Sequence, residues 1–285
     1  MDSAQPERLT IPVGDLLLDA VATGPADGPL VVLLHGFPQT SWSWRGVWPA
    51  LAAAGLRVVA PDQRGYSPGA RPTGVEAYRM PHLVADVVGL LDHLGAPTAH
   101  VVGHDWGAGV AWQLAARSPE RLRSLTAVSV PHPLAFVEAL LTDPDQRARS
   151  RYMKDWQAEG DTERALLDGG LERVFGGVPA VAVDRYLAAM REPGALSAAL
   201  SWYRAQRRQD LEGLEPVRVP TLHVWSDGDP ALGEVATRAT AAHVSAPYRL
   251  EVLRGVSHWV PEEAADRLAA LVLEHVQEVE QARTA

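Results

Sequence analysis

The sequence of 285 residues contains no cysteine, so disulfide bonds, a thiol nucleophile and thiolate metal sites are all excluded. This absence leaves the redox compartment open. Lysine is almost absent too, because Lys154 is the only one, and the formal net charge is −9. Nucleic acids and anionic membrane surfaces attract clustered positive charge. A partner of either kind is therefore not expected, whereas a small neutral substrate is.

Long apolar runs are also lacking. No segment approaches the ~20 apolar residues of a membrane span. Residues 1–8 do not combine a basic start with a long apolar core, as a secretory signal does. We therefore expect a cytoplasmic protein without a membrane partner, present as a monomer or a homodimer.

Of the residues that are present, 47% are hydrophobic, which is enough for one large α/β domain or for a domain with an insert. Short apolar segments alternate with segments of helical spacing, for example 41–54 and 78–94. This alternation predicts a doubly wound, mostly parallel sheet that binds ligands at the carboxyl ends of its strands. The expected strands are 7–13, 15–23, 30–34, 57–62, 99–103, 124–130, 219–225 and 248–253.

The alternation stops after Pro131 and resumes at Val219. In between, Ala, Leu, Arg and Glu dominate and no buried strand is expected, so this stretch predicts a helical insert over the sheet edge. We accordingly expect three parts: residues 1–132 and 217–285 form the α/β core, and residues 133–216 form a helical cap.

The segment Val101–Gly109 carries the first chemical signal. Asp105 stands between Gly103 and Gly107, and such spacing is typical of a sharp strand-to-helix turn that exposes its central side chain. Ser is usual at the centre, but a carboxylate needs no deprotonation and suits displacement at a saturated carbon. The product is an ester that water must later cleave. The alternative interpretation is an ordinary turn in which Asp105 caps the following helix.

A base for the water is expected at His258, which follows the last strand at the same edge of the sheet. Its second ring nitrogen requires an acceptor, and spacing alone leaves both Asp227 and Asp229 open, as well as a plain surface turn. The oxyanion needs two backbone donors, which we expect at Trp106 and, in the loop after the third strand, at Phe37.

Five motifs together resemble the α/β-hydrolase family, and specifically its epoxide hydrolase branch. The resemblance covers nearly the whole chain and implies an eight-stranded sheet with a helical cap. It favours Asp229 over Asp227 as the acid, and one departure is Ser226, where relatives usually have Gly. The motifs are His35–Pro38, Asp62–Ser67, Gly103–Gly107, Asp229–Pro230 and Gly255–Trp259.

In epoxide hydrolases two cap tyrosines bind the epoxide oxygen, and the resemblance implies Tyr203 and Tyr152 for these roles. Tyr203 lies in a Ser-Trp-Tyr-Arg segment, where relatives have Asn at the position of Ser201. Tyr152 precedes Trp156 by four residues, although Glu159 follows where relatives usually have Pro. A phenol with a pKa of ~10 can protonate the oxygen of an opening epoxide. The alternative for Tyr152 is a partly buried structural role.

The substrate pocket is expected to be lined by Phe37, Pro38, Trp106, Trp156 and Trp259. No cluster has metal-ligand spacing, so we expect neither a metal nor a cofactor. Dehalogenases of the same fold share the Asp nucleophile. However, Phe37 stands where haloalkane dehalogenases carry a halide-binding Asn, and Trp106 where haloacetate dehalogenases carry Arg. The sequence thus predicts an epoxide hydrolase, with a dehalogenase or a non-catalytic binding protein as alternatives.

Overall fold

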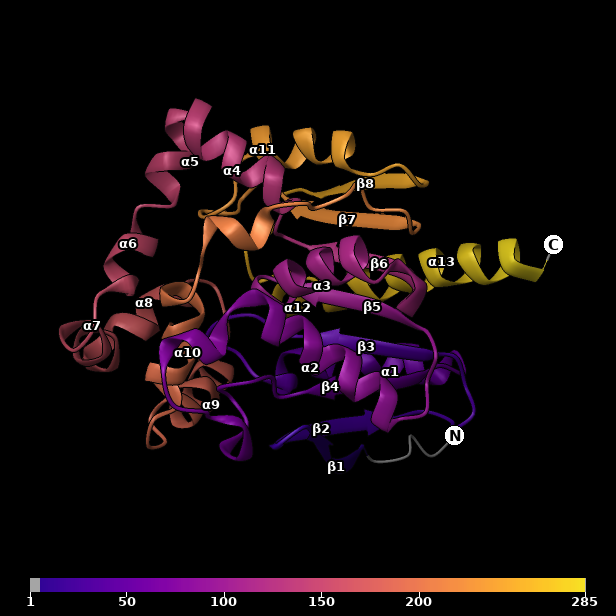
Figure 1. Ribbon diagram of the computed structural model, residues 1–285, viewed down its shortest axis with the longest axis horizontal. Helices are drawn as coiled ribbons and strands as arrows, with labels where there is room; N and C mark the ends of the chain where they lie inside the picture. The colour runs from indigo at the N-terminus through magenta and orange to yellow at the C-terminus, as the bar shows by residue number, and fades with distance from the viewer. Residues whose placement is uncertain (1–5, 285) are drawn as a thin grey trace.

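The computed structural model describes residues 6–284 and contains one eight-stranded sheet of order β1-β2-β4-β3-β5-β6-β7-β8 (Figure 1). Strand β2 runs antiparallel to its two neighbours, and the other neighbouring pairs are parallel. The predicted doubly wound, mostly parallel fold is therefore confirmed. The strands are β1 Glu7–Val13, β2 Leu16–Thr23, β3 Leu30–Leu34, β4 Arg57–Pro61, β5 Ala99–His104, β6 Leu122–Val128, β7 Thr221–Ser226 and β8 Tyr248–Leu253.

Strand β3 shows why the central strands are apolar throughout. All five of its residues are buried, with Val32 and Leu34 in the core on one face of the sheet and Val31 and Leu33 in the core on the other. Successive side chains of a strand point to opposite faces, so a strand covered on both faces needs no polar positions.

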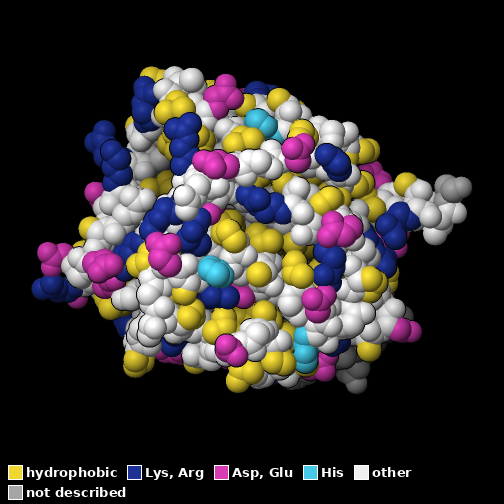
Figure 2. Space-filling model, viewed as in Figure 1, with side chains coloured by type: hydrophobic (Ala, Val, Ile, Leu, Met, Phe, Trp, Pro, Cys, Tyr) yellow, Lys and Arg dark blue, Asp and Glu magenta, His cyan; other side chains and the backbone are white. Residues whose placement is uncertain are grey.

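Helices cover both faces of the sheet (Figure 1). One core is closed by α2 (Met80–His93) and α3 (Trp106–Arg117), and the other by α1 (Trp48–Ala53) and α13 (Ala265–Thr284). On the face that α2 and α3 cover, hydrophobic side chains gather near the middle of the surface, with charged ones around them (Figure 2). Among residues 6–284, no helix is both long and apolar enough to cross a bilayer.

The expected helical stretch 41–54 is present but consists of two helices. It divides into a 3-10 helix, η1 (Ser41–Gly46), and α1, which begins at Trp48 and has Pro49 in its first turn. Proline lacks a backbone N–H and suits the first turn of a helix, so a new helix begins here. The remaining short helices outside residues 133–216 are η2 Pro68–Ala70, η3 Val75–Tyr78, η4 Pro119–Arg121, α11 Glu234–Ala239, η7 Thr240–His243 and α12 Val260–Glu263.

Residues 133–216, which we call the helical insertion, connect β6 to β7 and contain helices and loops without a strand. In Figure 1 these helices lie beyond the ends of the strands, whereas α13 projects on the opposite side. The division of the chain at 132 and 216 into a core and a cap domain stays a prediction. The helices are α4 Pro133–Thr142, α5 Pro144–Arg149, α6 Tyr152–Gln157, α7 Asp161–Ala165, η5 Leu166–Gly170, α8 Leu171–Val174, α9 Ala180–Met190, α10 Ala195–Arg204 and η6 Arg208–Leu211.

Candidate active site

Asp105 occupies a sharp turn between β5 and α3. Its φ of 51° lies in the positive region that residues other than glycine rarely adopt. The turn is tight: a Cβ on Gly107 would lie 2.2 Å from the carbonyl oxygen of Leu34, and one on Gly103 would lie 2.3 Å from that of Gly107. The Asp105 side chain makes no capping hydrogen bond to α3. Its carboxylate is therefore not used as a helix cap and is available for another role.

The loop after β3 holds one oxygen of this carboxylate. The backbone N–H of Phe37 donates to Asp105 Oδ1 over 2.8 Å, and the N–H of Trp106 is among the groups that lower the pKa of Asp105. Gly36 makes the close approach possible, because a Cβ there would lie 2.3 Å from the Asp105 Cβ. One expected oxyanion donor, the Phe37 N–H, thus lies at Oδ1 of the carboxylate, and Asp105 Oδ2 is free of this contact.

The same loop is fixed from behind by His35 and Gln63. The backbone N–H of Gln63 donates to His35 Nε2 over 3.1 Å, and the Gln63 side-chain amide donates to the His35 carbonyl over 2.6 Å. The Phe37–Pro38 peptide bond is cis. His35 therefore shapes the loop that presents the Phe37 N–H, rather than reaching the reacting atoms.

His258 lies between two carboxylates. Its Nε2 is 3.4 Å from Asp105 Oδ2, and its Nδ1 is 2.7 Å from Asp229 Oδ2. The imidazole is buried, and so is the side chain of Asp229, which has no exposed surface. The three side chains come from the ends of β5, β7 and β8, which the parallel sheet brings to one edge.

The structure also separates the two candidate acids. Asp229 turns Oδ2 toward His258, while its Oδ1 accepts the backbone N–H groups of Ala231 and Leu232 over 2.7 and 3.0 Å. Asp227 is exposed and instead accepts the N–H of Gly255 over 2.7 Å. Asp229 is therefore the carboxylate in contact with His258, whereas Asp227 closes a surface turn.

These contacts shift both pKa values. Burial disfavours charge on His258, but the charge of Asp229 and the hydrogen bond to Asp105 outweigh it and raise the pKa of His258 to about 10. Burial likewise opposes ionisation of Asp105, but the hydrogen bond and charge of His258 lower its pKa overall. In the resting site Asp105 is therefore anionic and His258 is protonated. Among residues 6–284, no group of three or more His, Asp or Glu side chains could hold a metal ion.

A cavity of about 360 Å³ brings both expected tyrosines to Asp105, and we call it the Asp105 cavity. Asp105, Trp106, Tyr152 and Tyr203 all line it. The rings of the two tyrosines are 6.4 Å apart, and Tyr203 stands edge-on to Trp106 at 4.8 Å. Burial, with the charge of Asp105 among the further causes, raises the pKa of both phenols. Both phenols are therefore neutral and keep a proton to donate.

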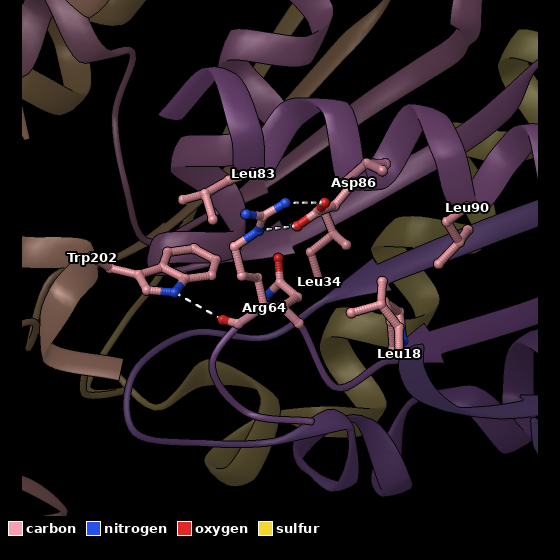
Figure 3. A pocket seen from close by; sticks show the side chains of 10 residues that line it. Leu18, Leu34, Arg64, Leu83, Asp86, Leu90 and Trp202 are labelled. Atoms are coloured by element: carbon pink, nitrogen blue, oxygen red, sulfur yellow. Dashed lines mark hydrogen bonds and ion pairs between the residues drawn. The ribbon is translucent and has the colours of Figure 1, made fainter. Parts of the chain in front are cut away.

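Trp202 anchors the helix that carries Tyr203. Its indole N–H donates to the carbonyl of Arg64 over 2.9 Å, and Arg64 makes two hydrogen bonds of 2.7 and 2.6 Å to Asp86 of α2 (Figure 3). Sequence reasoning missed this role of Trp202. Its signal is a bulky apolar side chain next to Tyr203, at helical spacing from Leu196 and Ala199, which predicts a contact with the core.

Four residues expected in the pocket do not line the Asp105 cavity: Phe37, Pro38, Trp156 and Trp259, whereas Trp106 does. Phe37 is only 2% exposed, and its ring lies 5.0 Å from that of Trp156. The reason is that α6 of the helical insertion packs against the loop after β3 and fills the space beside Phe37.

Trp259 belongs to a separate cluster between the helical insertion and the core. Its ring is 4.9 Å from that of Phe175, and its indole N–H donates to the Val174 carbonyl over 3.2 Å. Next to it, the fully buried carboxylate of Glu262 accepts a hydrogen bond from the Tyr186 hydroxyl. Arg45 of η1 binds the same carboxylate through two nitrogens. The insertion thus covers Trp259, which explains its distance from the Asp105 cavity.

A sequence model described as the alpha/beta hydrolase fold matches residues 29–265 of the chain. Epoxide hydrolase A of Mycobacterium tuberculosis is 34% identical, over 97% of this chain and 99% of that protein. A Bacillus subtilis protein named as a member of the AB hydrolase superfamily is 35% identical, over 92% of this chain and 95% of its own length.

Solved structures extend the similarity to three dimensions. Epoxide hydrolase A of Mycobacterium thermoresistibile has a TM-score of 0.84 at 29% identity, covering 96% of this chain and 98% of that one. A variant of an epoxide hydrolase from Bacillus megaterium, complexed with its product, has a TM-score of 0.86 at 27% identity, covering 94% of this chain and all of that one. The similarity therefore includes the helical insertion as well as the sheet.

Proposed function

Because the chain belongs to the α/β-hydrolase family and to its epoxide hydrolase branch, we propose that it opens an epoxide to a vicinal diol through an ester on Asp105. One juxtaposition carries the proposal: the Asp105 carboxylate shares a cavity with the phenols of Tyr152 and Tyr203. His258 completes the set, 3.4 Å from Asp105 Oδ2. In this proposal residues 133–216 act as the cap of a core formed by residues 1–132 and 217–285.

In the first step, Asp105 Oδ2 attacks a ring carbon of the epoxide, while the Phe37 N–H holds Oδ1. A bond forms between Oδ2 and that carbon, and the bond from the same carbon to the epoxide oxygen breaks. A phenolic proton of Tyr152 or Tyr203 moves to the departing oxygen, which becomes the first hydroxyl of the product. Proton donation of this kind contributes about 10²- to 10⁴-fold in rate.

Ester formation also prepares the base. The resting imidazolium of His258 owes its raised pKa partly to Asp105, and esterification removes that negative charge. The pKa of His258 therefore falls, and its proton can replace the one that the phenol gave up. His258 becomes neutral at the stage at which a water has to be activated.

In the second step, neutral His258 takes a proton from water, and the hydroxide attacks Cγ of the ester. The negative charge develops on Oδ1, where the N–H groups of Phe37 and Trp106 stabilise it. Collapse of this intermediate breaks the bond between Cγ and Oδ2, and the proton left on the attacking hydroxyl moves to Oδ2, which departs as the second hydroxyl of the diol. The water oxygen stays in the carboxylate, and the proton stays on His258. Asp229 holds the imidazole in orientation throughout.

A single-turnover reaction in ¹⁸O-labelled water tests this route. With enzyme in excess over styrene oxide, the first diol should contain unlabelled oxygen from Asp105, and the label should appear in the Asp105 carboxylate. The His258→Gln variant should accumulate the ester, visible as a mass increase equal to one epoxide. Label entering the first diol directly would exclude the covalent route. Halide release from haloalkanes without any diol from epoxides would indicate a dehalogenase, and epoxide binding without turnover would indicate a binding protein.

A further inference from the structure

The shape of the Asp105 cavity points to one class of epoxide. Resting on the proposed function, we infer that the substrate is a terminal epoxide with a single long apolar substituent, which lies along α3. The residues of α3 that line the cavity are Trp106, Gly109 and Gln113. They follow one face of the helix for two turns, and at about 1.5 Å per residue they span roughly 10 Å. The cavity is thus elongated, with Asp105 near one end.

Most of the other side chains that line the cavity are apolar. Side chains from the insertion and from the core face this length of the cavity, and burial of each CH₂ of a substrate chain against them is favourable. Six of these side chains are Met80, Val130, Phe136, Leu140, Met153 and Leu232.

The end far from Asp105 is polar and open to solvent. Gln113 donates to the backbone carbonyl of Asp210 over 3.2 Å, which places η6 at this end. Arg208, the first residue of η6, lines the cavity and is exposed. An apolar arm therefore reaches from the nucleophile to a solvated rim.

The side of Asp105 toward His258 offers no comparable space. Phe37 and Trp259 are 2% and 4% exposed, and neither lines the Asp105 cavity. Trp156 covers the first and Phe175 covers the second, with ring centroids 5.0 and 4.9 Å apart. A substituent on the second carbon of the epoxide would have to displace these packed rings. One ring carbon of the substrate is therefore unsubstituted.

Gly109 keeps the arm of the cavity open. Unlike Gly103 and Gly107, it is not required by a close backbone approach, because a Cβ there would meet only Met80 Cε, at 3.8 Å. Glycine inside a helix is also less favourable than alanine. A larger side chain at position 109 would therefore fold without a clash at the turn but would project into the cavity, one turn beyond Trp106.

The test compares terminal epoxides of increasing chain length with isomers substituted on both ring carbons. For the wild-type protein, kcat/KM should rise at least about tenfold from propylene oxide to epoxyoctane, and the doubly substituted isomers should react at least about tenfold more slowly. Gly109→Leu should lower kcat/KM for epoxyoctane at least about tenfold more than for propylene oxide, so that the gain from chain length disappears. Gly109→Ala is the matched control, expected to keep the gain and to raise the Tm.

Equal loss for short and long epoxides in Gly109→Leu, or equal rates for doubly substituted isomers, would overturn the inference. A second readout needs no turnover: long terminal alkanediols should raise the Tm of the wild-type protein more than short ones, and this difference should vanish in Gly109→Leu. If no epoxide is hydrolysed but the Tm depends on chain length, the proposed function fails, and only the part of the inference that places a single apolar chain along α3 stands. If epoxides are hydrolysed but neither kcat/KM nor the Tm depends on chain length, the proposed function stands and the inference fails.

Discussion

The ring nitrogen Nε2 of His104 lies 2.9 Å from the backbone carbonyl oxygen of His258. A carbonyl oxygen only accepts hydrogen bonds, so His104 donates and carries its proton on Nε2. The hydroxyl of Ser129 donates to the same carbonyl over 3.2 Å. The residue that precedes Asp105, the proposed nucleophile, therefore holds the peptide of the proposed base.

Replacement of His104 should slow ester hydrolysis more than ester formation. In His104→Phe, the His258 carbonyl loses a donor, and we expect ester hydrolysis to slow about tenfold with a smaller effect on ester formation. The fraction of ester-bound enzyme at steady state, measured by rapid quench and mass spectrometry, should rise. His104→Gln keeps an N–H donor and should restore most of the rate. Equal slowing of both steps would show that His104 acts only through stability.

Asp229→Asn should leave the first step largely intact and slow the second. Asparagine can donate to Nδ1 and so favours the wrong tautomer of His258, an exchange that costs about 10⁴-fold in a comparable triad. We expect the ester to accumulate in single-turnover experiments. Asp227→Asn is the matched control, because Asp227 bonds only to the surface turn at Gly255, and its rate should stay within about twofold. Similar losses in the two variants would contradict the role of Asp229.

The tyrosine variants should affect ring opening. Tyr203→Phe and Tyr152→Phe each remove one proton donor, and each should slow ester formation about 10²-fold. The double variant should form no detectable diol. Tyr248→Phe is the control, because its hydroxyl contacts His223 in β7 and does not line the Asp105 cavity. If the double variant opened epoxides at the rate of either single variant, the two phenols would not act together on the epoxide oxygen.

Stability should fall as the pH decreases below 6.5. Burial lowers the pKa of His104 and His223 to about 4 and that of His132 to about 3, and each ring has a buried nitrogen without a hydrogen-bond partner among residues 6–284. The unfolded chain therefore binds more protons, so the stability present above pH 6.5 is lost toward pH 4. At about 1.4 kcal/mol per pKa unit, the loss amounts to several kcal/mol. Urea unfolding at pH 7.5, 5.5 and 4.5 measures it, and a flat profile would contradict it.

Stability should also fall at alkaline pH, and there the cause is a raised pKa rather than a lowered one. Burial opposes the charge of His258, but Asp229 and Asp105 raise its pKa to about 10. A raised pKa stabilises the folded protein fully below pH 6.5, and this contribution is lost as the pH rises through 10. The His258→Gln variant should therefore show a shallower decline of unfolding free energy between pH 7 and 10 than the wild-type protein. The same slope in both proteins would assign the decline to other groups.

The central sheet and the edge that carries Asp105 and His258 could be predicted from the sequence, because both depend on local patterns. A continuous apolar run such as β3 predicts a buried strand, and the glycines on both sides of Asp105 predict a sharp turn. Asp227 and Asp229 could not be separated by spacing, because a turn can direct either carboxylate inward. The structure distinguishes them by the N–H groups of Ala231 and Leu232, which orient Asp229.

The pocket was harder to predict, because its walls depend on how the helical insertion packs. Trp259 follows His258 directly, and sequence proximity suggested that it lines the site. Phe175 covers it from the insertion, and no local pattern links these two residues. Trp202 is the converse case, since its hydrogen bond to Arg64 anchors the helix that brings Tyr203 to the Asp105 cavity, although Arg64 lies in a distant segment.

The buried carboxylate of Glu262 has a kinetic consequence. It joins Tyr186 of α9 to Arg45 of the core, beside the contact of Phe175 with Trp259. A hydrogen bond to a charged group contributes about 1.5–3 kcal/mol, and an aromatic contact adds about 0.5–1.5 kcal/mol. An opening that moved α9 together with Phe175 would break both contacts. We therefore expect α9 to stay in place during turnover. Substrate and product should instead enter and leave the Asp105 cavity near Arg208, through small movements of the side chains there.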